Sequence, residues 1–230
     1  DIFFNSSNIK YGIFFNIMKK DNLPKKIPVF PLSNFIIFPK TTVPLNIFEP
    51  RYIQMIDDSM KNNRYIGMIQ PKRTGDLKKP DLHKVGCIGK ITSFNETDDG
   101  RYLIVLNGIC RYETIGEISS SKLYRECEVN FNNFSNDLVE QKEIIKFSDL
   151  KQVFNDLKKL FEQQGYQINW KDLENQSVEQ TINTLSMASP FTLEEKQILL
   201  ETKNLLDRKK KLEEILVTYT NYNFTNKTIQ

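Results

Sequence analysis

The sequence predicts an α+β protein, in which a twisted, partly closed β-barrel with one inserted helix is followed by a C-terminal helical bundle. The first reason is that residues 27–131 contain roughly six or seven short apolar runs, which are rich in β-branched and aromatic residues and are separated by turn residues. The second reason is that from Leu138 onward the apolar residues recur every three or four positions, as is typical of amphipathic helices.

This change of period divides the chain into parts. We expect an N-terminal extension over residues 1–26, a β-barrel over 27–134, a helical subdomain over 135–217 and a flexible tail over 218–230. Residues 1–17 lack methionine and Met18 follows them, so we expect either disorder or a start at Met18. Polar residues interrupt the apolar run and disfavour a secretory signal, whereas a helix on a membrane surface stays open. No apolar run is long enough for a membrane span.

The strands of the barrel follow from their composition and from the turns between them. Ile27–Leu32 contains prolines, which remove ladder donors and favour a sheet edge. Glu96–Gly100 ends in Asp-Gly, which supplies the positive φ of a hairpin turn. Asn107-Gly108 interrupts the returning strand and predicts a bulge or bend that helps to close a barrel. The other expected extended segments are Phe35–Pro39, Val43–Phe48, Tyr65–Ile69, Val85–Phe94, Tyr102–Leu106, Ile109–Ile118 and Tyr124–Phe131.

The most specific stretch is Val43–Tyr52, where a short strand turns into the inserted helix. Pro50 suits the first helical position, because its missing N–H would be unpaired there anyway. We interpret Glu49 and Arg51 as charges that fix the turn, in preference to ligand-binding residues. Arg51→Ala should therefore reduce stability before it reduces binding. The structural motif is Phe48, Glu49, Pro50, Arg51 and Tyr52, of which Phe48 and Tyr52, together with Met55, should hold the helix on the barrel.

Helical periodicity and capping residues define the second part. An apolar stripe over Leu150–Phe161 predicts a helix that ends near Gly165. The basic run Arg208–Lys211 alternates with acidic residues, so we interpret it as a solvated helix face and not as a nucleic-acid site. Two pairs have the spacing of capping boxes, Ser177 with Gln180 and Thr192 with Glu195, and the second pair opens a helix that should reach about Val217.

Composition and missing motifs argue against several function classes. With 32 basic and 29 acidic residues, the net charge of +3 is too balanced to predict strong attraction to nucleic acid or anionic membranes. The three cysteines show no C-x-x-C spacing, so we expect buried thiols in a reducing cytoplasm. The only histidine, His83, lies in a polar loop where we expect it to be exposed. Without a phosphate-binding loop or a catalytic constellation, we expect no catalytic residue, no metal and no cofactor.

Several short sequence motifs, in this order and at this spacing, resemble those of a known protein family. In the β part they are Pro28–Leu32, Phe38-Pro39, Pro44-Leu45, Ile47–Tyr52, Val85–Gly89, Asp99–Tyr102, Leu106–Gly108, Arg111-Tyr112 and Tyr124-Arg125; in the helical part they are Asn183–Leu185, Pro190-Phe191, Glu195–Glu201 and Arg208. Over about residues 27–216 the chain resembles the N-terminal, substrate-binding domain of Lon proteases. One departure is Lys40, where the family often has glycine.

The resemblance implies a fold and a function. It implies a barrel of the PUA-like type and a stand-alone bacterial form, without the ATPase and protease domains of Lon. We therefore expect a non-enzymatic module that binds unfolded or regulatory polypeptides and acts as an adaptor or regulator of proteolysis. Peptide could add to a barrel edge or contact an apolar patch. The candidate contact residues are Phe35, Ile36, Phe38, Arg51, Tyr102 and Arg111, although core positions are favoured for the first three.

Two other functions stay open. The PUA-like barrel is also used on RNA, so RNA binding is the alternative by analogy of fold. The expected phosphate contacts are Arg51, Arg101, Arg111 and Arg125, with Tyr102 or Tyr112 for stacking on bases. A hydrolase whose site is not visible in the sequence is the third alternative.

Overall fold

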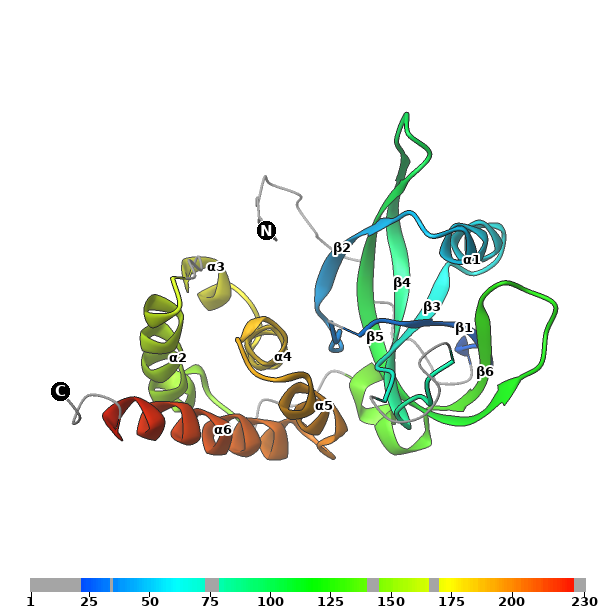
Figure 1. The fold of residues 1–230 in the computed structure, drawn as a ribbon. Coiled ribbons are helices and arrows are strands. Elements are labelled where there is room, and N and C mark those ends of the chain that lie inside the picture. Colours follow the sequence, from blue (N-terminus) through cyan, green and yellow to red (C-terminus); the bar gives the residue numbers. More distant parts are fainter. Residues whose placement is uncertain (1–21, 34, 73–78, 140–144, 166–169, 226–230) are drawn as a thin grey trace.

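The computed structural model of the protein describes residues 22–33, 35–72, 79–139, 145–165 and 170–225. Six strands and one helix form the first part of the fold, and further helices form the second part beside it (Figure 1). The predicted α+β class is confirmed. The expected start at Met18 and the open question of a surface helix concern residues outside the described ones.

The sheet closes into a ring that includes five of the six strands, so the barrel is only partly regular. The sheet order is β2-β5-β4-β3-β1-β6, and an additional pairing of β5 with β6 completes a ring. Strand β2 stands outside the ring, because it pairs with β5 alone. The predicted partly closed barrel is thereby confirmed. The elements are β1 (Lys26–Pro31), β2 (Thr42–Ile47), α1 (Pro50–Lys61), β3 (Tyr65–Ile69), β4 (Val85–Glu96), β5 (Tyr102–Ile118) and β6 (Arg125–Asn130).

A bulge lies where the sequence predicts one. The register of β4 and β5 shifts between Ile88 and Gly89, because Ile88 pairs with Cys110 and Gly89 pairs with Gly108. The residue between these two partners on β5 is therefore left without a partner in the ladder. A Cβ built on Gly108 would lie 2.1 Å from the carbonyl oxygen of Phe38, which only glycine tolerates. The neighbouring turn is left-handed at Lys40, with φ of 59°, which explains why a glycine would suit this position. Residues 35–39, which the sequence predicts to be extended, do not join the sheet as a strand.

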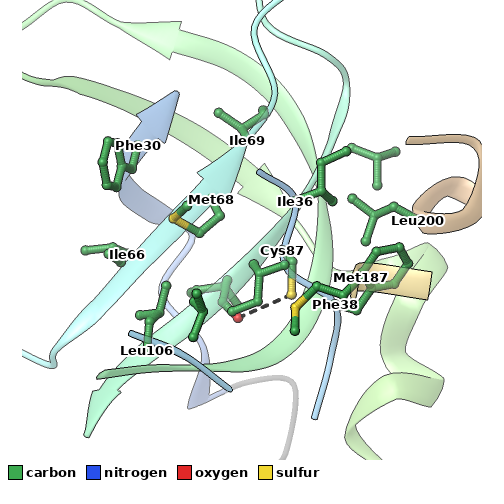
Figure 2. Packing of buried hydrophobic residues seen from close by; sticks show 14 of the residues in the cluster. Phe30, Ile36, Phe38, Ile66, Met68, Ile69, Cys87, Leu106, Met187 and Leu200 are labelled. Atoms are coloured by element: carbon green, nitrogen blue, oxygen red, sulfur yellow. Dashed lines mark hydrogen bonds between the residues drawn. The ribbon is translucent and has the colours of Figure 1, made fainter. Parts of the chain in front are cut away.

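Helix α1 covers one end of the barrel. Its apolar face is buried through Tyr52, Met55 and Ile56, and the Tyr52 ring lies 4.2 Å from that of Phe30. The prediction that Phe48 also holds this helix is wrong, because its side chain is 64% exposed. The side chains of β2 alternate, so the neighbour of the inward Ile47 points outward. Figure 2 shows part of the apolar core, which continues from the strands to Met187 on α4 and Leu200 on α5.

The helical part contains more breaks than the sequence indicates. Its elements are η2 (Asn132–Leu138), η3 (Phe147–Leu150), α2 (Lys151–Gln163), α3 (Trp170–Glu174), α4 (Val178–Ala188), α5 (Leu193–Glu201) and α6 (Leu205–Thr225). The capping box of Thr192 with Glu195 is confirmed, and Ser177 accepts from the Gln180 amide. The single helix expected from Thr192 to about Val217 is wrong, because the chain breaks after α5 and α6 then continues to Thr225.

Arg208 also departs from its prediction. Its side chain is buried on α6, over the ring of Phe38, and is not part of a solvated face. The three lysines that follow, Lys209 to Lys211, are half-buried or exposed, as expected of a surface helix.

We expect Gly108→Ala to destabilise the protein by about 2 kcal/mol or more, since the added methyl group meets backbone that has little room to move. Chemical denaturation would measure the free energy of unfolding. Gly116→Ala on the same strand is the matched control, because nothing lies within 4 Å of a Cβ built on that glycine. Equal losses from the two substitutions would contradict this account of the bulge.

Candidate functional site

The predicted contact residues do not form one surface. Ile36, Phe38 and Arg111 are buried, so they are not available to a partner, and Phe35 is only half-buried. For Ile36 and Phe38 the burial agrees with the core position that the sequence favours. Tyr102 is 9% exposed, and its hydroxyl donates to a carboxylate oxygen of Asp57 at 3.0 Å. Which residues contact a partner therefore stays a prediction.

The arginines proposed for RNA already have carboxylate partners. Arg51 pairs with Glu49 at 2.7 Å and Arg125 with Glu117 at 2.6 Å, while Arg101 pairs with Asp99. Arg111 pairs with Asp137 inside the protein, and the Tyr112 ring is fully buried. Each positive charge is thus locally balanced, and neither Tyr102 nor Tyr112 offers an open ring for stacking. These contacts weigh against the RNA alternative.

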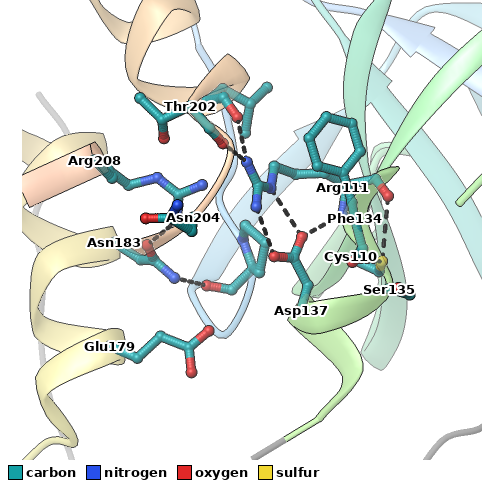
Figure 3. A network of polar contacts seen from close by, with 12 residues as sticks. Cys110, Arg111, Phe134, Ser135, Asp137, Glu179, Asn183, Thr202, Asn204 and Arg208 are labelled. Carbon is teal, nitrogen blue, oxygen red and sulfur yellow. Dashed lines mark hydrogen bonds and ion pairs between the residues drawn. The ribbon is translucent and has the colours of Figure 1, made fainter. Parts of the chain in front are cut away.

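A buried polar network joins the barrel to the helices (Figure 3). Arg111 on β5 donates to Asp137 through Nε at 2.9 Å and Nη2 at 2.8 Å, and both side chains are almost fully buried. Its Nη1 donates to the carbonyl oxygens of Leu200 and Thr202, where α5 ends. A helix end leaves its last carbonyls without partners and carries partial negative charge, so a guanidinium is well placed there.

Arg208 completes this network from α6. Its Nε donates to the Leu199 carbonyl at 3.0 Å and its Nη1 to Asn183 Oδ1 at 2.6 Å. Asn183 in turn donates to the Pro39 carbonyl at 2.9 Å, just before β2. Burial lowers the pKa of Arg208 to about 9, with nearby Arg111 as a second cause, yet the group stays charged at pH 7. Among the described residues, its Nη2 has no hydrogen-bond partner.

The break between α5 and α6 explains this arrangement. Because α5 stops at Glu201, three carbonyls at its end can accept, two from Arg111 on β5 and one from Arg208 on α6. Near the same side of the barrel, Lys40 forms an ion pair with Glu179 on α4. Gln197 on α5 donates to the Val85 carbonyl of β4 at 3.1 Å. The orientation of the helices is therefore fixed by polar contacts that the sequence patterns did not indicate.

Strand β2 is the open part of the barrel. It has one strand neighbour among the described strands, and it lies on the side of the barrel toward the helices (Figure 1). Along its outer face the pairing places Asn46 opposite Leu103 and Pro44 opposite Val105. Phe48 continues this face beyond the end of the strand, diagonal to Leu103, and the two side chains are 64% and 44% exposed. We call Pro44, Phe48, Leu103 and Val105 the outer strip.

The hairpin of β4 and β5 extends this exposed region beyond the ring (Figure 1). Phe94 is 38% exposed and its ring lies 4.8 Å from that of Tyr102, on the face opposite to the outer strip. At the tip, Asp99 accepts from Arg101 and Thr97, and these hydrogen bonds hold the pKa of its carboxyl well below the usual range. The hairpin is thus an amphipathic projection whose tip is held by its own hydrogen bonds.

The histidine, the cysteines and the acidic side chains of the described residues are the groups that could bind a metal ion. No three His, Cys, Asp or Glu side chains among these residues come together to hold a metal ion. His83 is half-buried and not exposed as predicted, and burial lowers its pKa. Burial also raises the pKa of all three thiols, to about 11 for Cys127, and all three cysteines are buried as expected. None of the described helices is long and apolar enough to cross a membrane.

We expect Asp137→Ala to destabilise the protein by about 3–5 kcal/mol, because it leaves Arg111 buried without its counter-charge. Urea denaturation would measure the loss. Asp99→Ala is the control, since it removes a carboxylate that pairs with arginine on the surface and should leave stability unchanged within error. The role given to the buried network fails if Asp137→Ala is as stable as this control.

Arg51→Ala should reduce the free energy of unfolding by less than about 1 kcal/mol, because its ion pair with Glu49 is half exposed. Tyr52→Ala, in contrast, should cost about 3 kcal/mol or more, since it removes a buried ring from α1. Thermal and urea denaturation of both variants would test this order. The reverse order would mean that the charged pair, and not the apolar face, holds the helix.

The fold matches solved structures of Lon N-terminal domains. The Lon N-terminal domain protein from Xanthomonas campestris superposes with a TM-score of 0.58 and 18% identity, covering 84% of this chain and 97% of that one. The N-terminal domain of Mycobacterium avium complex Lon protease gives 0.56 and 20% identity, covering 86% and 98%. At these identities, the similarity establishes the fold.

Curated relatives are Lon proteases. That of Flavobacterium johnsoniae is 26% identical over 203 residues, which are 83% of this chain and 24% of the relative. That of Desulfosudis oleivorans is 35% identical over 97 residues, which are 41% of this chain and 12% of the relative. The chain thus spans a quarter or less of the length of these relatives. The family model of the ATP-dependent protease La (LON) substrate-binding domain matches residues 26–218, and the chain belongs to this family.

Proposed function

We propose that this protein binds extended segments of other polypeptides along the free edge of β2 and over the outer strip. The family is named for substrate binding in Lon, which makes a polypeptide the first partner to consider. The observation that carries the proposal is that β2 has a single strand neighbour and an exposed apolar strip beside it. An edge strand offers backbone donors and acceptors to an added strand, and neighbouring side chains then provide selectivity.

The geometry supports this mode of binding. Pro44 removes one backbone donor from β2, which limits the pairing and guards against uncontrolled aggregation. Beyond the strand, Phe48 provides an exposed aromatic ring, and Leu103 lies diagonal to it across the pair. An extended peptide carries side chains on alternate faces, so every second residue could lie against the outer strip. We further propose that such binding presents or sequesters proteins, as an adaptor or regulator of proteolysis.

Phe48→Ser combined with Leu103→Ser should weaken binding to a permanently unfolded polypeptide, such as reduced and carboxymethylated lactalbumin, by at least about fivefold. The reason is that a surface contact of this kind contributes on the order of 1 kcal/mol. Fluorescence anisotropy with the labelled polypeptide would measure the affinity. Since both side chains are exposed, the fold should be preserved, which circular dichroism would verify.

The matched control is Ile198→Ser with Val217→Ser, which removes two exposed apolar side chains from α5 and α6. This variant should bind as the unaltered protein does. The proposal fails if both double variants lose affinity equally, because binding would then depend on general surface hydrophobicity, or if the unaltered protein does not bind at all.

A further inference from the structure

The outer strip belongs to a wider exposed face of the β2-β5-β4 sheet. On β5 this face is formed by alternate residues, because the residues between them are buried. In the ladder Leu103 lies between Asn46 of β2 and Asn95 of β4, so the face is three strands wide. We call it the neutral face, and its residues are Thr42, Pro44 and Asn46 of β2, Leu103, Val105 and Asn107 of β5, and Thr92, Ser93 and Asn95 of β4.

The side chains of the neutral face carry no charge, and all of them are exposed or half-buried. Hydrogen bonds join them across the strands, since the amide oxygen of Asn107 accepts from Thr42 at 3.0 Å and from Thr92 at 3.4 Å. Apart from three apolar residues, the side chains end in amide or hydroxyl groups, which can donate and accept. They can therefore satisfy polar groups of a partner but cannot neutralise a charge.

The charged residues that border the neutral face have their own partners or belong to the other face. At the hairpin turn, Arg101 pairs with Asp99. At the opposite end, the ammonium group of Lys90 lies 5.6 Å from the centroid of the Tyr65 ring. Glu96 belongs to the opposite face of the sheet, as its position in the ladder shows. A partner on the neutral face thus finds no free counter-charge among these residues.

Resting on the function proposed above, we infer that the preferred partner is an extended segment whose residues toward the neutral face are uncharged. Its apolar side chains lie beside Leu103 and Val105, and its amide or hydroxyl side chains lie beside the asparagines. A lysine or glutamate in such a position loses water without gaining a counter-charge, so both are disfavoured. An amide loses less, because it exchanges hydrogen bonds with water for hydrogen bonds with the protein.

The test uses labelled peptides that share an alternating apolar and serine sequence, in which one central apolar residue is replaced by asparagine, lysine or glutamate. In fluorescence anisotropy, the asparagine peptide should bind at least about fivefold tighter than either charged peptide. This ratio should be similar at about 50 mM and about 300 mM salt, because loss of hydration, unlike attraction between separated charges, is not screened by ions.

Asn46→Asp places one negative charge on the neutral face with little change of shape. The lysine peptide should then bind at least about fivefold tighter than the glutamate peptide, and this difference should shrink as salt is raised. Asn155→Asp is the matched control, because it adds the same charge at an exposed position on α2 and should leave the two charged peptides equal.

Equal affinities of the unaltered protein for all three peptides would overturn the inference while polypeptide binding stands. The same holds if Asn46→Asp does not separate the lysine peptide from the glutamate peptide, since the peptide would then lie elsewhere. Binding of none of the peptides would overturn both proposals. Concentration-dependent dimers in sedimentation that Phe48→Ser with Leu103→Ser abolishes would also overturn the inference, because the occupant would then be a second copy of this chain.

Discussion

The buried guanidinium of Arg111 holds the two parts of this molecule in one arrangement. From β5 it pairs with Asp137 of η2 and donates to the Leu200 carbonyl at the end of α5. Removing two charges from water is costly, so the pair is favourable only in this geometry, with its remaining donors satisfied by carbonyl groups. Arg208, Asn183 and the backbone before β2 extend the same network. The position of β2 relative to the helices follows from it.

Local patterns in the sequence predicted the elements of the fold, whereas contacts between distant residues were not accessible to them. The bulge at Gly108 and the capping box at Thr192 were correct, because each depends on a few adjacent residues. The prediction for Phe48 is wrong because the side chains of β2 alternate, so the residue after the inward Ile47 points outward. Arg208 does occupy the apolar face of α6, four residues before buried Leu212, and this spacing was the available signal.

The candidate site lies in the Val43–Tyr52 stretch, but not in the residues that the sequence brought forward. Of the contact residues that the sequence predicted, Arg51 lies in this stretch, and it forms an exposed ion pair with Glu49. The proposed binding rests on the single neighbour of β2 and the outward ring of Phe48. Which strand remains unpaired depends on the order of the whole sheet, so no local pattern could indicate it. The buried network joins the backbone just before this strand to α4 through Asn183.

The most direct test is nuclear magnetic resonance of the isotope-labelled protein with an unlabelled, extended apolar peptide. Nuclear Overhauser contacts between backbone protons of the peptide and those of residues 42–47 would show whether a strand has added to β2. The account predicts a regular series of such cross-strand contacts, together with contacts from alternate peptide side chains to Phe48 and Leu103. Contacts confined to the helical part, or side-chain contacts without any backbone pairing at β2, would contradict it.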